Sequence, residues 1–77
     1  MNEQQLEDLG FSKNKRFKEP YKWTKFIGKG PVLFHYDGNR KKIDLECQVD
    51  AYEEPITLIA NVKIEDMTQI NNIFNKV

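Results

Sequence analysis

The feature that most constrains the fold is a two-residue alternation over residues 42–49, within a strand predicted over residues 41–49. Apolar side chains occupy every second position, and the positions between them are polar. The apolar set is Ile43, Leu45, Cys47 and Val49, and the polar set is Lys42, Asp44, Glu46 and Gln48. Because successive side chains of a strand point to opposite faces, this pattern predicts a strand with one buried face and one wet face.

The period changes near the C-terminus from two residues to about 3.6, which predicts a helix beginning near Glu65. Two acids at its start, Glu65 and Asp66, stabilise the helix because negative side chains interact favourably with the positive N-terminal end of the helix dipole. The apolar stripe of this helix consists of Met67, Ile70, Ile73, Phe74 and Val77. A sheet that is apolar on one face needs one covering layer, so we expect this stripe to cover the sheet.

Three further strands are predicted, over residues 21–27, 32–36 and 56–62, because β-branched and aromatic residues are enriched there. The sequence GKGP at 28–31 breaks the first from the second. In the last strand, the alternation places Ile56, Leu58, Ala60 and Val62 on the inner face. The other face of the sheet, which includes His35, is expected to be wet.

The hairpin between the second and third predicted strands has a register that can be argued from parity. A four-residue loop at 37–40 places Phe34 opposite Ile43 and Val32 opposite Leu45, apolar against apolar. A three-residue loop sends every side chain of one strand to the wrong face. A two-residue Asp-Gly turn keeps the parity, but it sets Phe34 opposite Lys41. We therefore expect the four-residue loop.

A short helix is predicted over residues 2–9, with Asn2 as its N-cap and Gly10 ending it in the left-handed conformation. Because so short a helix is not stable by itself, its apolar residues must dock on the sheet. These residues are Leu6, Leu9 and Phe11. Residues 12–20 are expected to form a loop or a mobile arm. The predicted fold is α+β and a single domain, residues 1–77: a three- to four-stranded antiparallel meander, a short N-terminal helix and a C-terminal amphipathic helix on one face.

The size and composition place the chain among globular proteins, with 39% apolar and 31% charged residues. A single core of 77 residues supplies only about 3 to 5 kcal/mol, which leaves room for a partner or a homodimer. One cysteine, Cys47, cannot form an internal disulfide, which favours a cytoplasmic protein. The longest apolar runs are too short to span a bilayer, so no membrane association is expected.

No catalytic group or cofactor site is predicted. His35 is the single histidine and is expected at the surface. Ser12 lies in the predicted charged loop, so it is not expected to pair with His35 as a nucleophile. Cys47 falls on the core face of the sheet and His35 on the other face, so these two are not expected to pair either. With one Cys and one His, a metal site would need carboxylates as its other ligands. No carboxylate lies at a sequence spacing that is typical of metal ligands. We therefore expect no metal and no enzyme activity.

A basic and aromatic segment is the candidate binding site. Residues 11–31 hold five aromatic residues and seven Lys or Arg against one acid. Residues 10–42 carry a net charge of +8, from ten basic and two acidic residues, whereas residues 43–77 carry −5, from two lysines and seven acids. The candidate binding residues, which include the hairpin tip, are Lys13, Lys15, Arg16, Phe17, Lys22, Lys25, Lys29, Arg40 and Lys41.

Two interpretations of this segment remain open. Cations among aromatic rings suit a single-stranded nucleic acid or an anionic nucleotide, because cations meet phosphates while rings stack on bases. Alternatively, Tyr21, Trp23 and Ile27 point into the core, and the lysines solubilise an edge strand. Phe17 distinguishes the two, because an exposed Phe17 favours a binding site.

The order of elements resembles small proteins encoded by bacteriophages and mobile elements. The resemblance lies in the opening helix that closes in LEDLGF at 6–11, the short-stranded meander, and the strand-to-helix run ITLIANVKIEDMTQINNIF at 56–74. It implies a non-enzymatic binding module in the host cytoplasm that binds and inhibits a host protein, for example one of an immune system. Binding of nucleic acid or sequestration of a nucleotide is the alternative. The resemblance supplies no site residues.

Overall fold

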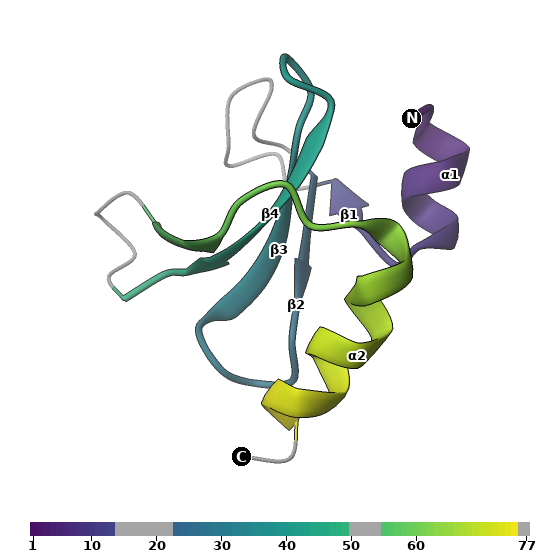
Figure 1. Ribbon diagram of the computed structural model, residues 1–77. Coiled ribbons are helices and arrows are strands. Elements are labelled where there is room, and N and C mark those ends of the chain that lie inside the picture. The colour runs from purple at the N-terminus through teal and green to yellow at the C-terminus, as the bar shows by residue number, and fades with distance from the viewer. Residues whose placement is uncertain (14–22, 50–54, 76–77) are drawn as a thin grey trace.

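The computed structural model describes residues 1–13, 23–49 and 55–75, and these form an α+β fold on one five-stranded antiparallel sheet (Figure 1). The strands follow one another in the sheet in chain order: β1 (Ser12–Lys13), β2 (Trp23–Phe26), β3 (Val32–Asp37), β4 (Lys42–Cys47) and β5 (Ile56–Ile59). The helices are α1 (Glu3–Asp8) and α2 (Ile64–Asn75).

The fold class is confirmed, but the predicted count of three or four strands is wrong. The additional strand is β1, in which Ser12 and Lys13 pair with Thr24 and Trp23 of β2. The sequence predicted a loop or a mobile arm there, because residues 12–20 are basic and nearly without apolar side chains. A two-residue strand is too short to show a period that would reveal it. Its pairing with β2 makes it a strand, and it forms one edge of the sheet.

Helix α1 begins with a capping box. The Oδ1 of Asn2 accepts a hydrogen bond from the N–H of Gln5 at 2.8 Å, and the Oε1 of Gln5 accepts one from the N–H of Asn2 at 3.0 Å. Two N–H groups at the start of the helix are thus satisfied by side chains. The prediction of Asn2 as N-cap is confirmed.

The end of α1 is a Schellman motif. The N–H of Gly10 donates to the carbonyl of Glu7 at 2.9 Å, and the N–H of Phe11 donates to the carbonyl of Leu6 at 3.0 Å. Gly10 has a φ of +94°, which a residue with a side chain rarely adopts. Leu6 and Phe11 are both buried in the core, so the short helix is held by docking, as predicted.

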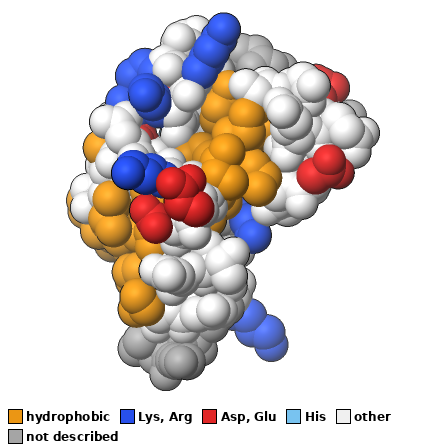
Figure 2. All heavy atoms as spheres, turned by 45° about the vertical axis from the view of Figure 1, so that its right-hand side comes forward, with side chains coloured by type: hydrophobic (Ala, Val, Ile, Leu, Met, Phe, Trp, Pro, Cys, Tyr) orange, Lys and Arg blue, Asp and Glu red, His pale blue; other side chains and the backbone are white. Residues whose placement is uncertain are grey.

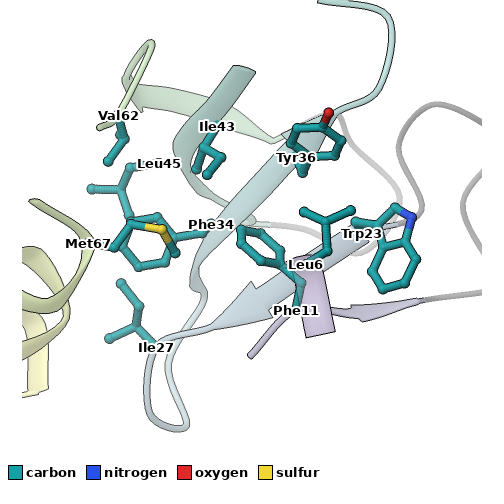
Figure 3. Close-up of a cluster of buried hydrophobic side chains, with 10 residues drawn as sticks. All are labelled: Leu6, Phe11, Trp23, Ile27, Phe34, Tyr36, Ile43, Leu45, Val62 and Met67. Atoms are coloured by element: carbon teal, nitrogen blue, oxygen red, sulfur yellow. The ribbon is translucent and has the colours of Figure 1, made fainter. Parts of the chain in front are cut away.

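The hydrophobic core lies between the sheet and the two helices (Figure 3). Both helices lie on the same side of the sheet in Figure 1. The buried cluster comprises Leu6, Phe11, Trp23, Ile27, Phe34, Tyr36, Ile43, Leu45, Val62 and Met67. Of the predicted α2 stripe, Met67 is buried, and Ile70 and Phe74 pack against the core. Ile73 is exposed, contrary to the prediction, and Val77 lies outside the described residues.

The hairpin between β3 and β4 has a four-residue loop, but one residue later than predicted. Asp37 pairs with Lys42, so the loop covers residues 38–41, and Tyr36 pairs with Ile43 and Phe34 with Leu45. The predicted parity is therefore correct, and the predicted register is wrong by two residues. Lys41 adopts a φ of +57° in the turn, and its N–H donates to the carbonyl of Asp37 at 2.7 Å.

The alternation predicted that the second face of the sheet, which carries His35, is exposed to solvent. The centre of this face is buried instead. Five side chains on this face are each less than one-tenth exposed: Thr24, Leu33, His35, Asp37 and Asp44. These residues come from the three central strands, where the register aligns Thr24 with His35 and His35 with Asp44. Ion pairing of the two carboxylates with Arg40 is what allows charged groups to be buried there.

Strand β5 also differs from its prediction. A register irregularity lies between Leu45 and Glu46 of β4, because Leu45 pairs with Ile59 whereas Glu46 pairs with Thr57. The strand ends at Ile59, and none of its four residues is buried, although Ile56 and Leu58 were predicted to point inward. Ala60 is exposed as well. Val62 is buried as predicted, and its N–H donates to the carbonyl of Ile43 at 2.7 Å.

Strand β4 is shorter than predicted, because it ends at Cys47 and not at residue 49. Val49 is 72% exposed, although the alternation had placed it on the core face. Cys47 is only partly buried, and it pairs with Val32 at the end of the ladder. The alternation therefore identifies the buried centre of the strand, Ile43 and Leu45, and overestimates its length.

Candidate functional site

Three chemically active side chains meet at the centre of the second face: His35 of β3, and Asp44 and Glu46 of β4. His35 pairs directly with Asp44, and Glu46 is two residues further along β4, so all three share one face. One ligand atom from each lies within 4.8 Å of the other two. The Nδ1 of His35 and the Oε1 of Glu46 are 3.4 Å apart. We call these three residues the His35 cluster.

The His35 cluster is largely shielded from water. His35 is 5% and Asp44 is 4% exposed, and the side chain of Glu46 is 13% exposed. Two carboxylates beside an imidazole, with little water, form an environment that attracts a metal cation strongly. The three side chains together offer the ligand types of a metal site.

Asp44 is fixed from two sides. The backbone N–H of Asn61 donates to its Oδ1 at 3.0 Å, and the Nη2 of Arg40 donates to its Oδ2. Asn61 has a φ of +57°, so the chain after β5 turns sharply where it contacts Asp44. Arg40 therefore connects the hairpin tip with the centre of β4.

Arg40 also binds Asp37, and this pair closes the hairpin loop. Its Nε donates to the Oδ2 of Asp37 at 2.8 Å, while the Oδ1 of Asp37 accepts from the N–H of Asn39 at 2.9 Å. The Arg40 side chain, helped by the Arg40 and Asn39 amides, lowers the pKa of the Asp37 carboxyl against the opposing effect of burial. The hydrogen bonds to Asp37 and then to Asp44 raise the pKa of Arg40 above its ordinary value.

The sequence predicted His35 at the surface and no carboxylate at ligand spacing from it, and both statements are wrong. The predicted register caused the second error, because it placed His35 opposite Lys42. A shift of two residues sets it opposite Asp44. Pairing Asp37 with Lys42, a favourable opposite-charge pair, is the sequence signal that identifies the observed register.

The predicted basic and aromatic site is only partly described. Four of its predicted members lie outside the described residues: Lys15, Arg16, Phe17 and Lys22. Tyr21, which the core interpretation named, lies outside them too. The described members are Lys13, Lys25, Lys29, Arg40 and Lys41. Trp23 and Ile27 are buried, as the core interpretation predicted for them.

Three of the five described cations are engaged within the molecule. Besides Arg40, the Nζ of Lys13 lies 3.2 Å from Glu3 and 5.8 Å from the centre of the Trp23 ring. The Nζ of Lys25 donates to the backbone carbonyl of Leu9 at 3.1 Å. Their charges are therefore partly satisfied before any ligand binds.

The structure also separates the described cations in space. Lys29 lies in the turn before β3, and Arg40 and Lys41 lie in the turn after it. β3 has six residues, so about 20 Å of strand separates the two turns. These turns lie at opposite ends of the sheet in Figure 1. Lys29 and Lys41 therefore do not belong to one compact site.

A second surface feature is the apolar outer edge of the sheet. Ile56, Leu58 and Ile59 of β5 are 58%, 45% and 46% exposed. Ile64 and Ile73 of α2 are exposed too. Figure 2 shows hydrophobic side chains reaching the surface on the helix-bearing side of the molecule. Where such side chains form a large contiguous patch, that patch commonly contacts another molecule.

The comparisons with known proteins give no relative: no family model, curated protein or solved structure matches the chain. Function must therefore be argued from the surface and the side chains themselves. In the described part of the chain, no helix has the length and apolar character needed to cross a membrane.

Proposed function

We propose that this protein is a non-enzymatic binding module, encoded by a phage or a mobile element, that binds and inhibits a host protein. The binding surface in this proposal is β5, which forms the end of the described sheet. The partner adds an extended strand to the outer edge of β5, with apolar side chains over Ile56 and Ile59. The observation that supports the proposal is the difference between the two edges of the sheet.

The edge at β1 has the usual protection against strand pairing. It is two residues long, and Lys13 is one of them. Short edge strands and edge lysines prevent proteins from pairing edge to edge. The edge at β5 has neither protection, because its sequence is ITLI and none of its residues is charged or buried.

Strand β5 exposes three of its four side chains as apolar groups at the edge of the sheet. Ile56 pairs with Cys47 and Ile59 pairs with Leu45, so these two isoleucines share a face of the sheet, and Leu58 lies at the register irregularity between them. A strand added to an edge gains affinity from main-chain hydrogen bonds and specificity from side-chain contacts on either face. Exposed apolar side chains along an uncharged edge strand offer such a partner both kinds of contact.

Nucleic acid or nucleotide binding through the basic and aromatic segment has less support. Lys13, Lys25 and Arg40 already bind groups of the protein itself, and Lys29 lies far from the hairpin tip. Inhibition of a host protein and the phage origin rest on the resemblance in the order of elements.

The test is capture of a partner from nuclease-treated host lysate by three forms of the full chain: wild type, Ile56→Lys and Ile73→Lys. The two substituted isoleucines are 58% and 63% exposed, so each change should alter the free energy of unfolding by only about 0.5 kcal/mol. A lysine on β5 disfavours strand pairing, whereas one on α2 does not touch that edge.

We expect one stoichiometric protein to bind wild type and Ile73→Lys, and to bind Ile56→Lys at least about tenfold more weakly, a loss of about 1.4 kcal/mol. Capture that is equal in all three forms would contradict the β5 surface. A partner lost on nuclease treatment would favour nucleic acid. A dimer of the purified chain that Ile56→Lys abolishes would show that a second copy occupies the edge.

A further inference from the structure

We propose that the His35 cluster binds a divalent transition-metal ion, and that Zn²⁺ matches its ligands best. His35 supplies an imidazole nitrogen, and Asp44 and Glu46 supply carboxylate oxygens. Imidazole suits Zn²⁺ and its neighbours in the first transition row, whereas Mg²⁺ and Ca²⁺ prefer oxygen ligands alone.

The spacing of the ligand atoms fits coordination. Two ligands at about 2.0 to 2.1 Å from Zn²⁺, in tetrahedral geometry, lie about 3.3 Å from each other. The Nδ1 of His35 and the Oε1 of Glu46 are 3.4 Å apart. One oxygen of Asp44 lies within 4.8 Å of both atoms.

The local charge also favours a dication. Asp37, Asp44 and Glu46 are carboxylates, and among the residues that the structure describes Arg40 is the cation that binds two of them. These four groups together carry a formal charge of −2. Carboxylates that face each other in a buried place repel one another, and a divalent ion between them relieves that repulsion.

Asp44 keeps ligand capacity although it already accepts two hydrogen bonds. A carboxylate offers about four lone-pair positions, and the Asn61 N–H and Arg40 use two of them. Partners of this kind orient a metal ligand and are a regular part of metal sites. Cys47 alternates onto the opposite face of β4, so it is not a member of the set.

The bound ion would join β3 to β4 at the centre of the sheet. His35 and Asp44 are buried, so the ion serves the fold and is poorly placed to meet a substrate. This inference is independent of the β5 proposal, because Ile56→Lys changes no proposed ligand.

The test uses the chelator-treated full chain titrated with zinc sulfate, followed by calorimetry and by ¹⁵N NMR of the histidine ring. His35 is the single histidine, so its ring resonances are assigned without ambiguity. We expect one ion per chain, a shift of the coordinated ring nitrogen, and little response to Mg²⁺. Bound Zn²⁺ should also raise the melting temperature, because it binds the folded state.

The matched variants are Glu46→Gln and Glu65→Gln, which make the same chemical change inside the cluster and on exposed α2. Loss of one ligand should weaken Zn²⁺ binding at least about tenfold in Glu46→Gln, and Glu65→Gln should bind as wild type. Unmoved His35 resonances in wild-type protein with excess Zn²⁺ would overturn the proposal without any variant. Equal affinity of Glu46→Gln and wild type, or binding that Cys47→Ser abolishes, would overturn it too.

Discussion

The Nζ of Lys25, on β2, donates a hydrogen bond to the backbone carbonyl of Leu9, at the C-terminal end of α1. The distance is 3.1 Å, and the lysine is partly buried. Carbonyl groups at a helix end lack intrahelical partners and carry partial negative charge, so a cation there stabilises the helix. Lys25 thus links the sheet to α1, although the sequence suggested a role in ligand binding.

Lys25→Met should lower the free energy of unfolding by about 1 to 2 kcal/mol, because a charge-assisted hydrogen bond is lost while the aliphatic stem is retained. Chemical denaturation monitored by circular dichroism measures the change. The matched control is Lys29→Met, in an exposed turn, where the change should stay within about 0.5 kcal/mol. Equal effects of the two variants would show that the Lys25–Leu9 bond contributes nothing to stability.

The elements that a local pattern determines could be predicted from the sequence. The cap at Asn2, the turn at Gly10 and the alternation through Ile43 and Leu45 each depend on residues close together in the chain, and each is confirmed. β1 could not be predicted, because its two residues become a strand only by pairing with β2. Register and pairing are properties of two segments, and one segment alone does not contain them.

The candidate site depended on the same missing information. Polar residues such as His35 and Asp44 fall on the solvent phase of an alternating pattern, so the pattern alone predicts them as exposed. They become buried because Arg40 and the Asn61 N–H satisfy Asp44, and because the register sets Asp44 beside His35. The apolar edge of β5 was missed for a related reason, since an irregularity at Leu45 and Glu46 overrides its alternation.

Asp37 should make folding stability dependent on acid pH. Its bond with Arg40 lowers the pKa of Asp37 in the folded protein below the ordinary value of 3.8. The carboxylate form is therefore favoured by folding, so its stabilising effect is present above that ordinary value. The effect is lost as the pH falls through the lower, folded pKa.

The measurement compares wild type with Asp37→Asn in denaturant unfolding at several pH values. Wild type should be the more stable at neutral pH, and the difference should narrow as the pH falls below about 4. NMR titration of the Asp37 carboxyl provides the control, because its pKa should rise toward the ordinary value in Arg40→Gln. An Asp37 that titrates identically with and without Arg40 would show that the Arg40 bond does not lower its pKa.

The buried centre of the sheet is best tested with two phenylalanines on neighbouring strands. Phe34 is fully buried at 0% exposure, whereas Phe26 is 46% exposed. Phe34→Ala should cost about 3 to 5 kcal/mol, because it leaves a cavity in the core. That cost equals the whole stability expected of so small a core, about 3 to 5 kcal/mol, so the variant should show no cooperative thermal transition. Phe26→Ala makes the same change and should cost about 1 kcal/mol. If the two variants lost equal stability, Phe34 would not lie at the centre of the core.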